Sequence, residues 1–452
     1  MNKFKGGFPD CEVCIVGLGY VGLTLATVMA GSGFHVTGVE VRSDVLELLR
    51  EGRAHFFEPG LEGRLKQAIR DGRISFSSEI PSNCAATVFI ITVGTPLGSD
   101  GKSTMHGIGA VTRQVAKVLK PNDLVVLRST VKQGTTRNVV LPVLQATGIQ
   151  FDLAFCPERT LEGKALIELR QLPQIVGGVN LKSTIRASQV FQFITPTVVR
   201  VSNVETAEFI KLIDNANRDI LFAYANEVAR CCDVLGISAL EVIQAGKLGY
   251  PRTNLPMPGL VGGPCLEKDP YILVEGLEER GITPEITLAA RRINERQPVE
   301  VACYLSSLLK QSFPVDPVIV LMGLAFKGQP VTDDLRGTLA KPFYSALRHH
   351  FPDAKFRGYD SVVSKNEIIK LGLTPCTSIE KAFFGANLVV ILNNHPDFGA
   401  MSIEILSASL ARPSLIYDFW NLFNAKELSL APGVGYLALG SHGCGILPGE
   451  GA

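Results

Sequence analysis

The segment from Gly259 to Asp269 combines a single thiol with residue types that would activate it. It reads GLVGGPCLEKD, with Cys265 among three glycines and close to Lys268 and Asp269. A cysteine is strongly nucleophilic as the thiolate, and a nearby cation favours that form. Glycine lets a backbone approach a ligand closely. The segment indicates a thiol that forms a covalent intermediate, although a glycine-rich loop around a buried cysteine would have the same composition.

A dinucleotide-binding fingerprint lies near the start of the chain. An apolar run ending at Val16 leads into a GxGxxG motif, which consists of Gly17, Leu18, Gly19, Tyr20, Val21 and Gly22. The first glycine allows a tight turn, the second admits a pyrophosphate, and the third lets a helix pack on a strand. The phosphates then lie at a helix N-terminus.

Glu40 ends the next apolar run, where a carboxylate binds the ribose hydroxyls and repels a 2′-phosphate. The pattern predicts NAD as cofactor, although the nearby Arg42 weakens the preference over NADP. A hydride acceptor together with a nucleophilic thiol suggests an oxidation through a thiohemiacetal and a thioester.

Composition excludes several classes of function. A chain of 452 residues is expected to form two or three domains. The 44 basic and 43 acidic residues give a net charge of +1, which provides no field for binding nucleic acid or a membrane. The chain contains no long apolar run, and its first ten residues are too polar for a signal peptide. We expect a cytoplasmic protein whose ten cysteines are thiols and which holds no metal.

Apolar runs alternate with helical segments, which predicts an α/β fold. The expected strands are 11–17, 35–41, 88–93, 124–128, 153–155 and 174–179, then 318–323, 355–358, 387–392, 414–417 and 434–439. Helical spacing predicts one long helix over 206–235 and a second over 287–310 that is broken near Pro298. We therefore expect two Rossmann-like domains with parallel sheets, at 1–203 and 313–452, joined by a central helical domain at 204–312.

Polar residues follow several predicted strands and share one face of the long helix. Thr95 and Pro96 follow one strand and Thr130 another, at the sheet edge where α/β folds bind ligands. Lys211 and Asn215 are four residues apart and could contact an oxygen that carries charge during oxidation. Ordinary turns and surface polarity would explain these residues equally well.

Seven motifs, in order, resemble those of the UDP-glucose/GDP-mannose dehydrogenase family over almost the full chain. They are GLGYVG at 17–22, Gly94-Thr95-Pro96, Arg128-Ser129-Thr130, Pro157-Glu158-Arg159, Lys211 with Asn215, the Cys265 segment, and Gly323–Lys327 with Asp333–Arg336.

This resemblance implies a four-electron oxidation of a sugar C6 hydroxyl to a uronic acid with two NAD, for synthesis of surface polysaccharide precursors. Cys265 is similar to the family's nucleophile, and Lys211 with Asn215 to the residues that stabilise the oxyanion. Asp269 resembles an acid/base residue, Glu158 the glutamate for proton transfer or thioester hydrolysis, and Thr130 a threonine that places water.

The resemblance also implies binding residues for a UDP-sugar. These are Leu161, Arg252, Gly259, Gly262, Phe326 and Lys327, besides Lys211 and Asn215. The family's counterpart of Arg252 reaches the substrate of a neighbouring subunit, which implies at least a homodimer along the long helix. Arg336 resembles a cofactor contact.

The identity of the sugar depends on conflicting signals. Arg159 and Arg218 resemble the branch that oxidises UDP-N-acetylhexosamines, with UDP-N-acetylmannosamine favoured. Pro264, however, stands where that branch usually has His, and Lys268 is similar to the UDP-glucose and GDP-mannose branches. An oxidation that stops at the aldehyde needs no thiol, which argues against a single-step enzyme. A dinucleotide-binding protein without activity is disfavoured because Cys265, Lys211 and Asp269 are all present.

Overall fold

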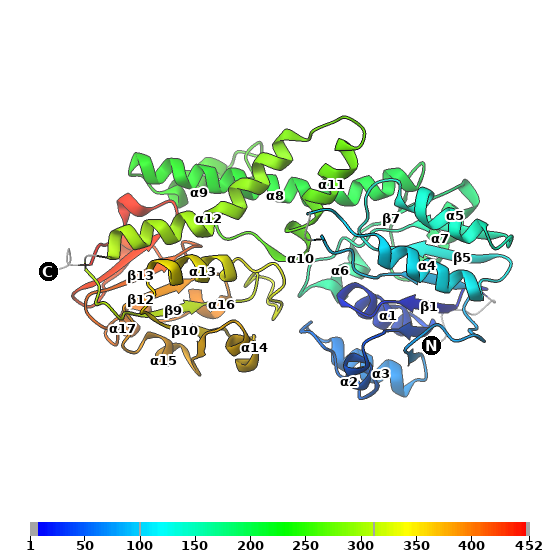
Figure 1. Ribbon diagram of the computed structural model, residues 1–452, viewed down its shortest axis with the longest axis horizontal. Helices are drawn as coiled ribbons and strands as arrows, with labels where there is room; N and C mark the ends of the chain where they lie inside the picture. Colours follow the sequence, from blue (N-terminus) through cyan, green and yellow to red (C-terminus); the bar gives the residue numbers. More distant parts are fainter. Residues whose placement is uncertain (1–7, 99–100, 311, 449–452) are drawn as a thin grey trace. The chain divides into compact units, whose positions relative to one another are not determined.

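Two groups of strands organise the chain in the computed structural model, which is drawn in Figure 1. The structure describes residues 8–98, 101–310 and 312–448. One unit extends to Asn215 and includes Tyr271–Thr283, while the other comprises Ala216–Pro270 and the chain from Pro284 onward. The division falls within helix α8 (Val204–Leu235). This helix begins two residues before the predicted start.

The first unit contains a sheet in the order β3-β2-β1-β4-β5-β6-β7-β8. Its strands are parallel except for the antiparallel pair β6 and β7. The strands are β1 (Glu12–Val16), β2 (His35–Val39), β3 (Ile74–Ser77), β4 (Val88–Ile91), β5 (Asp123–Leu127), β6 (Phe151–Phe155), β7 (Gln174–Gly178) and β8 (Val198–Arg200). Strands β2 and β3 lie on one side of β1, and β4 and the later strands lie on the other, so the strand order reverses between β1 and β4. Sheets of this kind bind ligands at that point.

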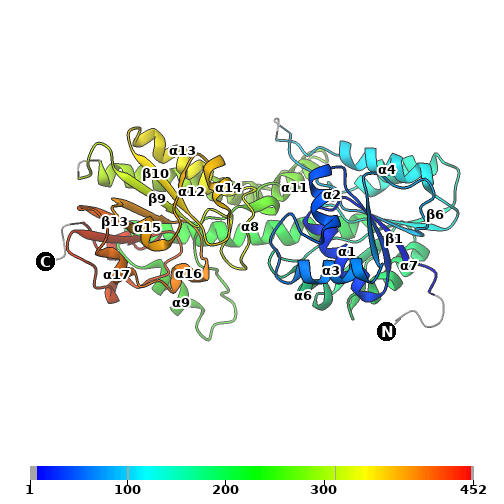
Figure 2. The same cartoon turned by 90° about the horizontal axis from the view of Figure 1, so that it is seen from below.

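Alternate residues of β1 face two different cores. Val13 and Ile15 belong to the core beneath α1, α6 and α7, whereas Cys14 and Val16 belong to the core beneath α4 and α5. Figure 2 shows these two helical layers on opposite sides of the sheet. The helices of this unit, besides part of α8, are α1 (Tyr20–Ser32), α2 (Ser43–Arg50), α3 (Leu61–Arg70), α4 (His106–Val118), the π-helical turn η1 (Thr136–Val140), α5 (Leu141–Gln145), α6 (Ala165–Gln171) and α7 (Leu181–Gln192). It also contains α11 (Asp269–Glu278) from Tyr271 onward.

The second unit repeats the same strand order in a smaller, fully parallel sheet, β11-β10-β9-β12-β13-β14. Its strands are β9 (Val318–Met322), β10 (Lys355–Tyr359), β11 (Thr374–Pro375), β12 (Leu388–Ile391), β13 (Ser414–Asp418) and β14 (Val434–Ala438). The predicted α/β fold with two Rossmann-like parallel sheets and a long central helix is confirmed.

The second sheet is also covered on both faces. Ile319 and Leu321 pack toward α12 and α13, and Val320 and Met322 pack toward α15 and α17, as Figure 1 shows. The helices are α9 (Ala239–Lys247), α10 (Gly263–Leu266), α12 (Glu285–Leu309), α13 (Ala340–His350), α14 (Lys365–Lys370), α15 (Ile379–Phe383), α16 (Pro396–Gly399) and α17 (Ile403–Ser407), with 3₁₀ turns η2 (Ala425–Glu427) and η3 (His442–Cys444).

The predicted break near Pro298 is wrong, because α12 continues through this residue. Proline cannot donate to the carbonyl of Asn294, one turn earlier. The helix nevertheless keeps a buried face on both sides of the proline, which includes Ala290, Val301 and Leu305. Packing of that face offsets the lost hydrogen bond.

Candidate active site

The fingerprint forms a tight turn between β1 and α1. Gly17 has φ +95°, and a Cβ on Gly22 would lie 1.8 Å from the carbonyl oxygen of Gly17, so both positions require glycine. At Gly19 the space around a Cβ position is open to 4 Å. Helix α1 begins directly afterwards and its N-cap makes no side-chain hydrogen bond. The N–H groups of its first turn can therefore receive a pyrophosphate.

Glu40 lies at the end of β2 beside this turn. Its Oε2 accepts from the N–H of Leu18 at 3.1 Å, and its Oε1 accepts from the N–H of Arg42 at 3.1 Å. These bonds hold a buried carboxylate beside the glycine turn, where it can accept from ribose hydroxyls. The glycine turn, the uncapped helix and Glu40 together fit an NAD molecule.

Tyr20 links the fingerprint to the loop that follows β6. Its hydroxyl donates to Glu58 and accepts from the N–H of Gly163 at 3.1 Å. Burial and the Glu58 carboxylate raise the pKa of Tyr20 above its usual range, so the phenol stays neutral. This predicted cofactor residue therefore also anchors the loop that carries Leu161, whose N–H donates to Glu168 at 2.7 Å.

The ends of β4 and β5 bring two predicted cofactor residues together. The hydroxyl of Thr95 donates to the carbonyl oxygen of Thr130 at 2.6 Å, because the two strands are paired side by side. Thr95 is buried, whereas Pro96 is exposed on the same loop.

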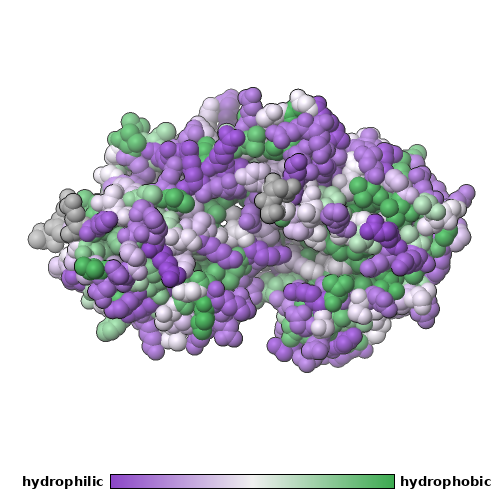
Figure 3. All heavy atoms as spheres, in the orientation of Figure 1, coloured by the Kyte–Doolittle hydropathy of each residue, from purple (hydrophilic) through white to green (hydrophobic). Residues whose placement is uncertain are grey.

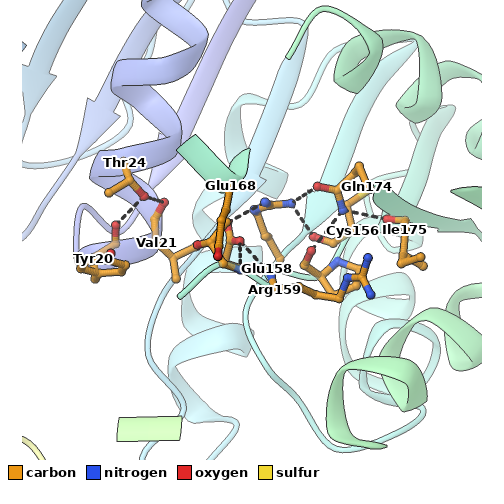
Figure 4. A network of polar contacts seen from close by, with 12 residues as sticks. Tyr20, Val21, Thr24, Cys156, Glu158, Arg159, Glu168, Gln174 and Ile175 are labelled. Atoms are coloured by element: carbon orange, nitrogen blue, oxygen red, sulfur yellow. Dashed lines mark hydrogen bonds and ion pairs between the residues drawn. The ribbon is translucent and has the colours of Figure 1, made fainter. Parts of the chain in front are cut away.

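Glu158 is a buried carboxylate held by Arg128. The guanidinium donates to Glu158 Oε2 at 2.6 Å and to the Cys156 carbonyl at 2.9 Å. Glu158 Oε1 accepts from the N–H groups of Arg159 and Thr160, both at 2.8 Å. Figure 4 shows Glu158, Cys156, Arg159 and Gln174 within this network. The sequence motif contains Arg128, but sequence reasoning assigned it no such role.

Burial alone would raise the pKa of Glu158. The charge of Arg128, the hydrogen bonds from Thr160 and Arg128, and the charge of Lys211 together hold that pKa below its usual value. Glu158 is therefore an ionised carboxylate at neutral pH and can accept a proton.

Lys211 and Asn215 lie on α8 and are both buried, as their shared helix face requires. Arg159 is predicted to bind substrate, and its guanidinium forms hydrogen bonds with residues of the first unit. It donates to Asp214 at 3.2 Å and to the carbonyl of Pro173 at 2.8 Å. The first unit thus gathers a cofactor turn, a buried base and a buried cation.

Cys265 is exposed on the short helix α10 in the second unit, which excludes a loop around a buried cysteine. Asp269 is fully buried at the start of α11. The ammonium of Lys268 donates to Asp269 at 2.6 Å, so this predicted activator of the thiol pairs with the carboxylate.

The glycines around Cys265 pack closely against other residues of the second unit. A Cβ on Gly259 would lie 2.7 Å from the Trp420 ring, and one on Gly262 would lie 2.2 Å from the carbonyl oxygen of Gly337. Gly263 has φ +94° and packs directly on Phe326. Close packing within the unit requires glycine at these positions, and the contact of Gly259 and Gly262 with a substrate stays a prediction.

The other predicted binding residues of this unit lie on loops and on α8. Lys327 places its ammonium 5.2 Å from the centre of the Phe326 ring, on the loop after β9. Arg336 is exposed, and its backbone N–H and its guanidinium both donate to the Asp334 carboxylate. Arg218 is exposed on α8, and Arg252 lies 5.3 Å from the Tyr250 ring centre.

In the part of the chain that the structure describes, no cluster of three or more His, Cys, Asp or Glu residues could hold a metal ion. Across the same residues, no helix combines the length and the apolarity needed to cross a membrane. On the face drawn in Figure 3, hydrophobic atoms lie scattered among hydrophilic ones.

Three family models match the chain in succession. They describe the NAD binding domain (residues 11–195), the central domain (residues 205–296) and the UDP binding domain (residues 320–425) of the UDP-glucose/GDP-mannose dehydrogenase family. The first model covers β1 to β7 and the third covers most of β9 through β13, while the central model covers nearly all of α8 and the Cys265 loop.

Individual relatives agree with these matches. A UDP-N-acetyl-D-mannosamine dehydrogenase from Pyrococcus horikoshii is 33% identical over 95% of this chain and 98% of its own. A solved structure of the enzyme of that name and organism has a TM-score of 0.85 at 31% identity and covers 95% of this chain and 99% of its own. A UDP-glucose dehydrogenase from Pyrobaculum islandicum has a TM-score of 0.84 at 26% identity, with 96% and 99% covered.

Proposed function

The chain belongs to the UDP-glucose/GDP-mannose dehydrogenase family and is an NAD-dependent UDP-sugar dehydrogenase, and from this premise we propose that it oxidises the C6 hydroxyl of a UDP-N-acetylhexosamine to a uronic acid. The preferred sugar of this proposal is UDP-N-acetylmannosamine. A relative of that name supports it, at 33% identity over nearly the whole chain, as do Arg159 and Arg218. An NDP-N-acetyl-D-galactosaminuronic acid dehydrogenase of Ralstonia nicotianae, 30% identical over 92% of this chain and 97% of its own, supports an N-acetylated sugar in general.

In the proposed first oxidation, C6 changes from alcohol to aldehyde: C6 loses a hydride and its hydroxyl loses a proton, which the Glu158 carboxylate accepts through a water. The oxygen carries negative charge on the way. NAD, when bound, accepts the hydride from C6 in each of the two oxidations. Lys211 and Asn215 donate to the oxygen and stabilise its charge, and their burial on α8 strengthens this interaction.

The second oxidation requires a covalent adduct. The Cys265 sulfur adds to C6 of the aldehyde and gives a thiohemiacetal, whose oxidation leaves a thioester. A water placed by Thr130 then attacks C6 and releases the thiolate, and Glu158 accepts the proton of the water. Asp269 takes up the proton from the thiol and orients water. The lowered pKa keeps Glu158 in the unprotonated form that a base requires.

The exposed thiol of Cys265 is the observation that carries this proposal. Transfer of one hydride from an alcohol to NAD needs no thiol, whereas formation of an acid through a thioester does. The remaining assigned contacts stay predictions. They are Arg159, Leu161, Arg252, Gly259, Gly262, Phe326 and Lys327 for the substrate, and Thr95, Pro96 and Arg336 for the cofactor.

UDP-glucose or GDP-mannose is the second candidate substrate. Pro264 and Lys268 favour it within the Cys265 segment. A panel of UDP-N-acetylmannosamine, UDP-N-acetylglucosamine, UDP-N-acetylgalactosamine, UDP-glucose and GDP-mannose separates the candidates by kcat/KM. We expect the highest value for UDP-N-acetylmannosamine, and activity with UDP-glucose or GDP-mannose alone would assign the chain to the second candidate.

We expect Arg218→Leu to reduce kcat/KM for the N-acetylated sugar by about tenfold to 100-fold, the value of a hydrogen bond from a charged donor. Its exposed guanidinium is proposed to donate to the acetamido oxygen. UDP-glucose, which has no such oxygen, provides the internal control. An equal loss with both sugars would remove Arg218 as a determinant of specificity.

We propose a homodimer that forms along α8. Leu221, Tyr224, Val234 and Leu235 are exposed on this helix, and Val242 is exposed on α9. An exposed apolar stripe of this kind is typical of an interface between subunits. The sedimentation coefficient of the purified protein tests the assembly.

We also propose that the enzyme works in the cytoplasm and supplies a surface polysaccharide precursor. All ten cysteines are free thiols, which suits a reducing compartment.

A further inference from the structure

A buried polar network lies beneath the Cys265 loop in the second unit. Arg291 and Asn294 on α12 meet Asp219 and Asn226 on α8, and all four side chains are at most 2% exposed. A buried arginine is costly, and apolar residues of similar size often pack as stably. The hydrogen bonds from this network to the backbone of the Cys265 loop therefore indicate its role.

Arg291 joins the two sides of the loop. One guanidinium nitrogen donates to the carbonyl of Leu266 at 2.9 Å and to Asp219 Oδ1 at 2.7 Å. The other donates to the carbonyl of Val261 at 3.2 Å. These carbonyls lie four residues before Cys265 and one residue after it, and both of their residues are buried. Buried carbonyls need a partner, and a planar guanidinium can serve both at once.

Asn226 fixes the start of the loop. Its side chain accepts from the N–H of Gly259 at 2.9 Å and donates to the carbonyl of Gly259 at 3.1 Å. It also donates to Asn294 at 2.9 Å, and Asn294 donates to Asp219 Oδ1 at 2.9 Å. The loop is thus bonded at three backbone positions to one continuous network.

We propose that Arg291 and Asn226 are positioning residues that hold the Cys265 loop in a single conformation and so fix the place of its sulfur. The catalytic consequence rests on the proposed role of Cys265, whereas the effect on the loop does not. A nucleophile accelerates a reaction only when it is held in line with the atom that it attacks.

Arg291→Lys separates positioning from folding. Lysine keeps a charge for Asp219, but its single nitrogen cannot reproduce the planar fork that serves both carbonyls. We expect kcat to fall about 100-fold, as displaced catalytic groups cause, while the KM for NAD stays unchanged. Hydrogen–deuterium exchange of peptide 259–268 should rise about tenfold. The neighbouring Arg292 is exposed, and Arg292→Lys should change neither quantity.

Asn226→Ala provides a second variant with a local signature. Loss of its two bonds to Gly259 should speed exchange at Gly259 and Leu260 more than at Leu266, and should lower kcat. If Arg291→Lys does not fold, hydrogen–deuterium exchange and kcat of Asn226→Ala test the proposal instead. Wild-type exchange of peptide 259–268 in the folded variant would overturn the proposal. Faster exchange with wild-type kcat would also overturn it if Cys265→Ala is inactive. If Cys265→Ala keeps its turnover while Arg291→Lys loosens the loop, the proposed function fails but the hold on the loop stands.

Discussion

Replacing Cys265 with alanine is expected to abolish formation of the uronic acid and to leave NAD binding intact. Without the sulfur, no thiohemiacetal forms and the second oxidation loses its covalent intermediate. We expect the rate of acid formation to fall at least about 10⁴-fold, as for other enzymes that lose their nucleophile. Chromatography of the sugar products measures the acid, and fluorescence titration of the full-length variant measures NAD binding.

Cys303→Ala is the matched control. Cys303 is another exposed thiol of the second unit, on α12, with its sulfur 3.4 Å from His350 Nε2. This variant should form the acid at the wild-type rate. Wild-type acid formation by Cys265→Ala, or an equal loss in Cys303→Ala, would contradict the thioester mechanism.

The second large effect is expected from Lys211→Met, which should lower kcat about 10²–10³-fold, the usual cost of removing one donor to an oxyanion. The buried ammonium also lowers the pKa of Glu158. Its loss should therefore raise that pKa and move the acid limb of the pH–rate profile upward, since Glu158 must be ionised to act as a base.

Lys117 is an exposed lysine of the same unit, on α4, and Lys117→Met serves as control. It should change neither kcat nor the profile. A Lys211→Met variant with a reduced kcat but an unshifted acid limb would show that Glu158 does not control that limb. An unchanged kcat would remove Lys211 from the reaction.

Local patterns predicted much of the fold. The GxGxxG motif and the apolar runs placed β1, α1 and β2 within a few residues, because each pattern depends on neighbours in the chain. The strands β3, β8 and β11 were not predicted. They are two to four residues long, and all three are edge strands in which at most one residue is buried.

Contacts between distant residues could not be predicted. Glu158 meets Arg128 across 30 residues, and Arg291 meets Asp219 across 72. The packing of Gly259 on Trp420 and of Gly262 on Gly337 was not predicted, because these partners are remote in sequence. Sequence spacing also placed Lys268 beside the thiol, whereas its ammonium binds Asp269.

The number of NADH molecules formed per sugar tests the central claim, a four-electron oxidation, most directly. Limiting UDP-N-acetylmannosamine is converted to completion with excess NAD, and the absorbance of NADH is compared with the amount of sugar consumed. The account predicts two NADH per sugar and the uronic acid as product. One NADH per sugar, with the aldehyde as product, would contradict it.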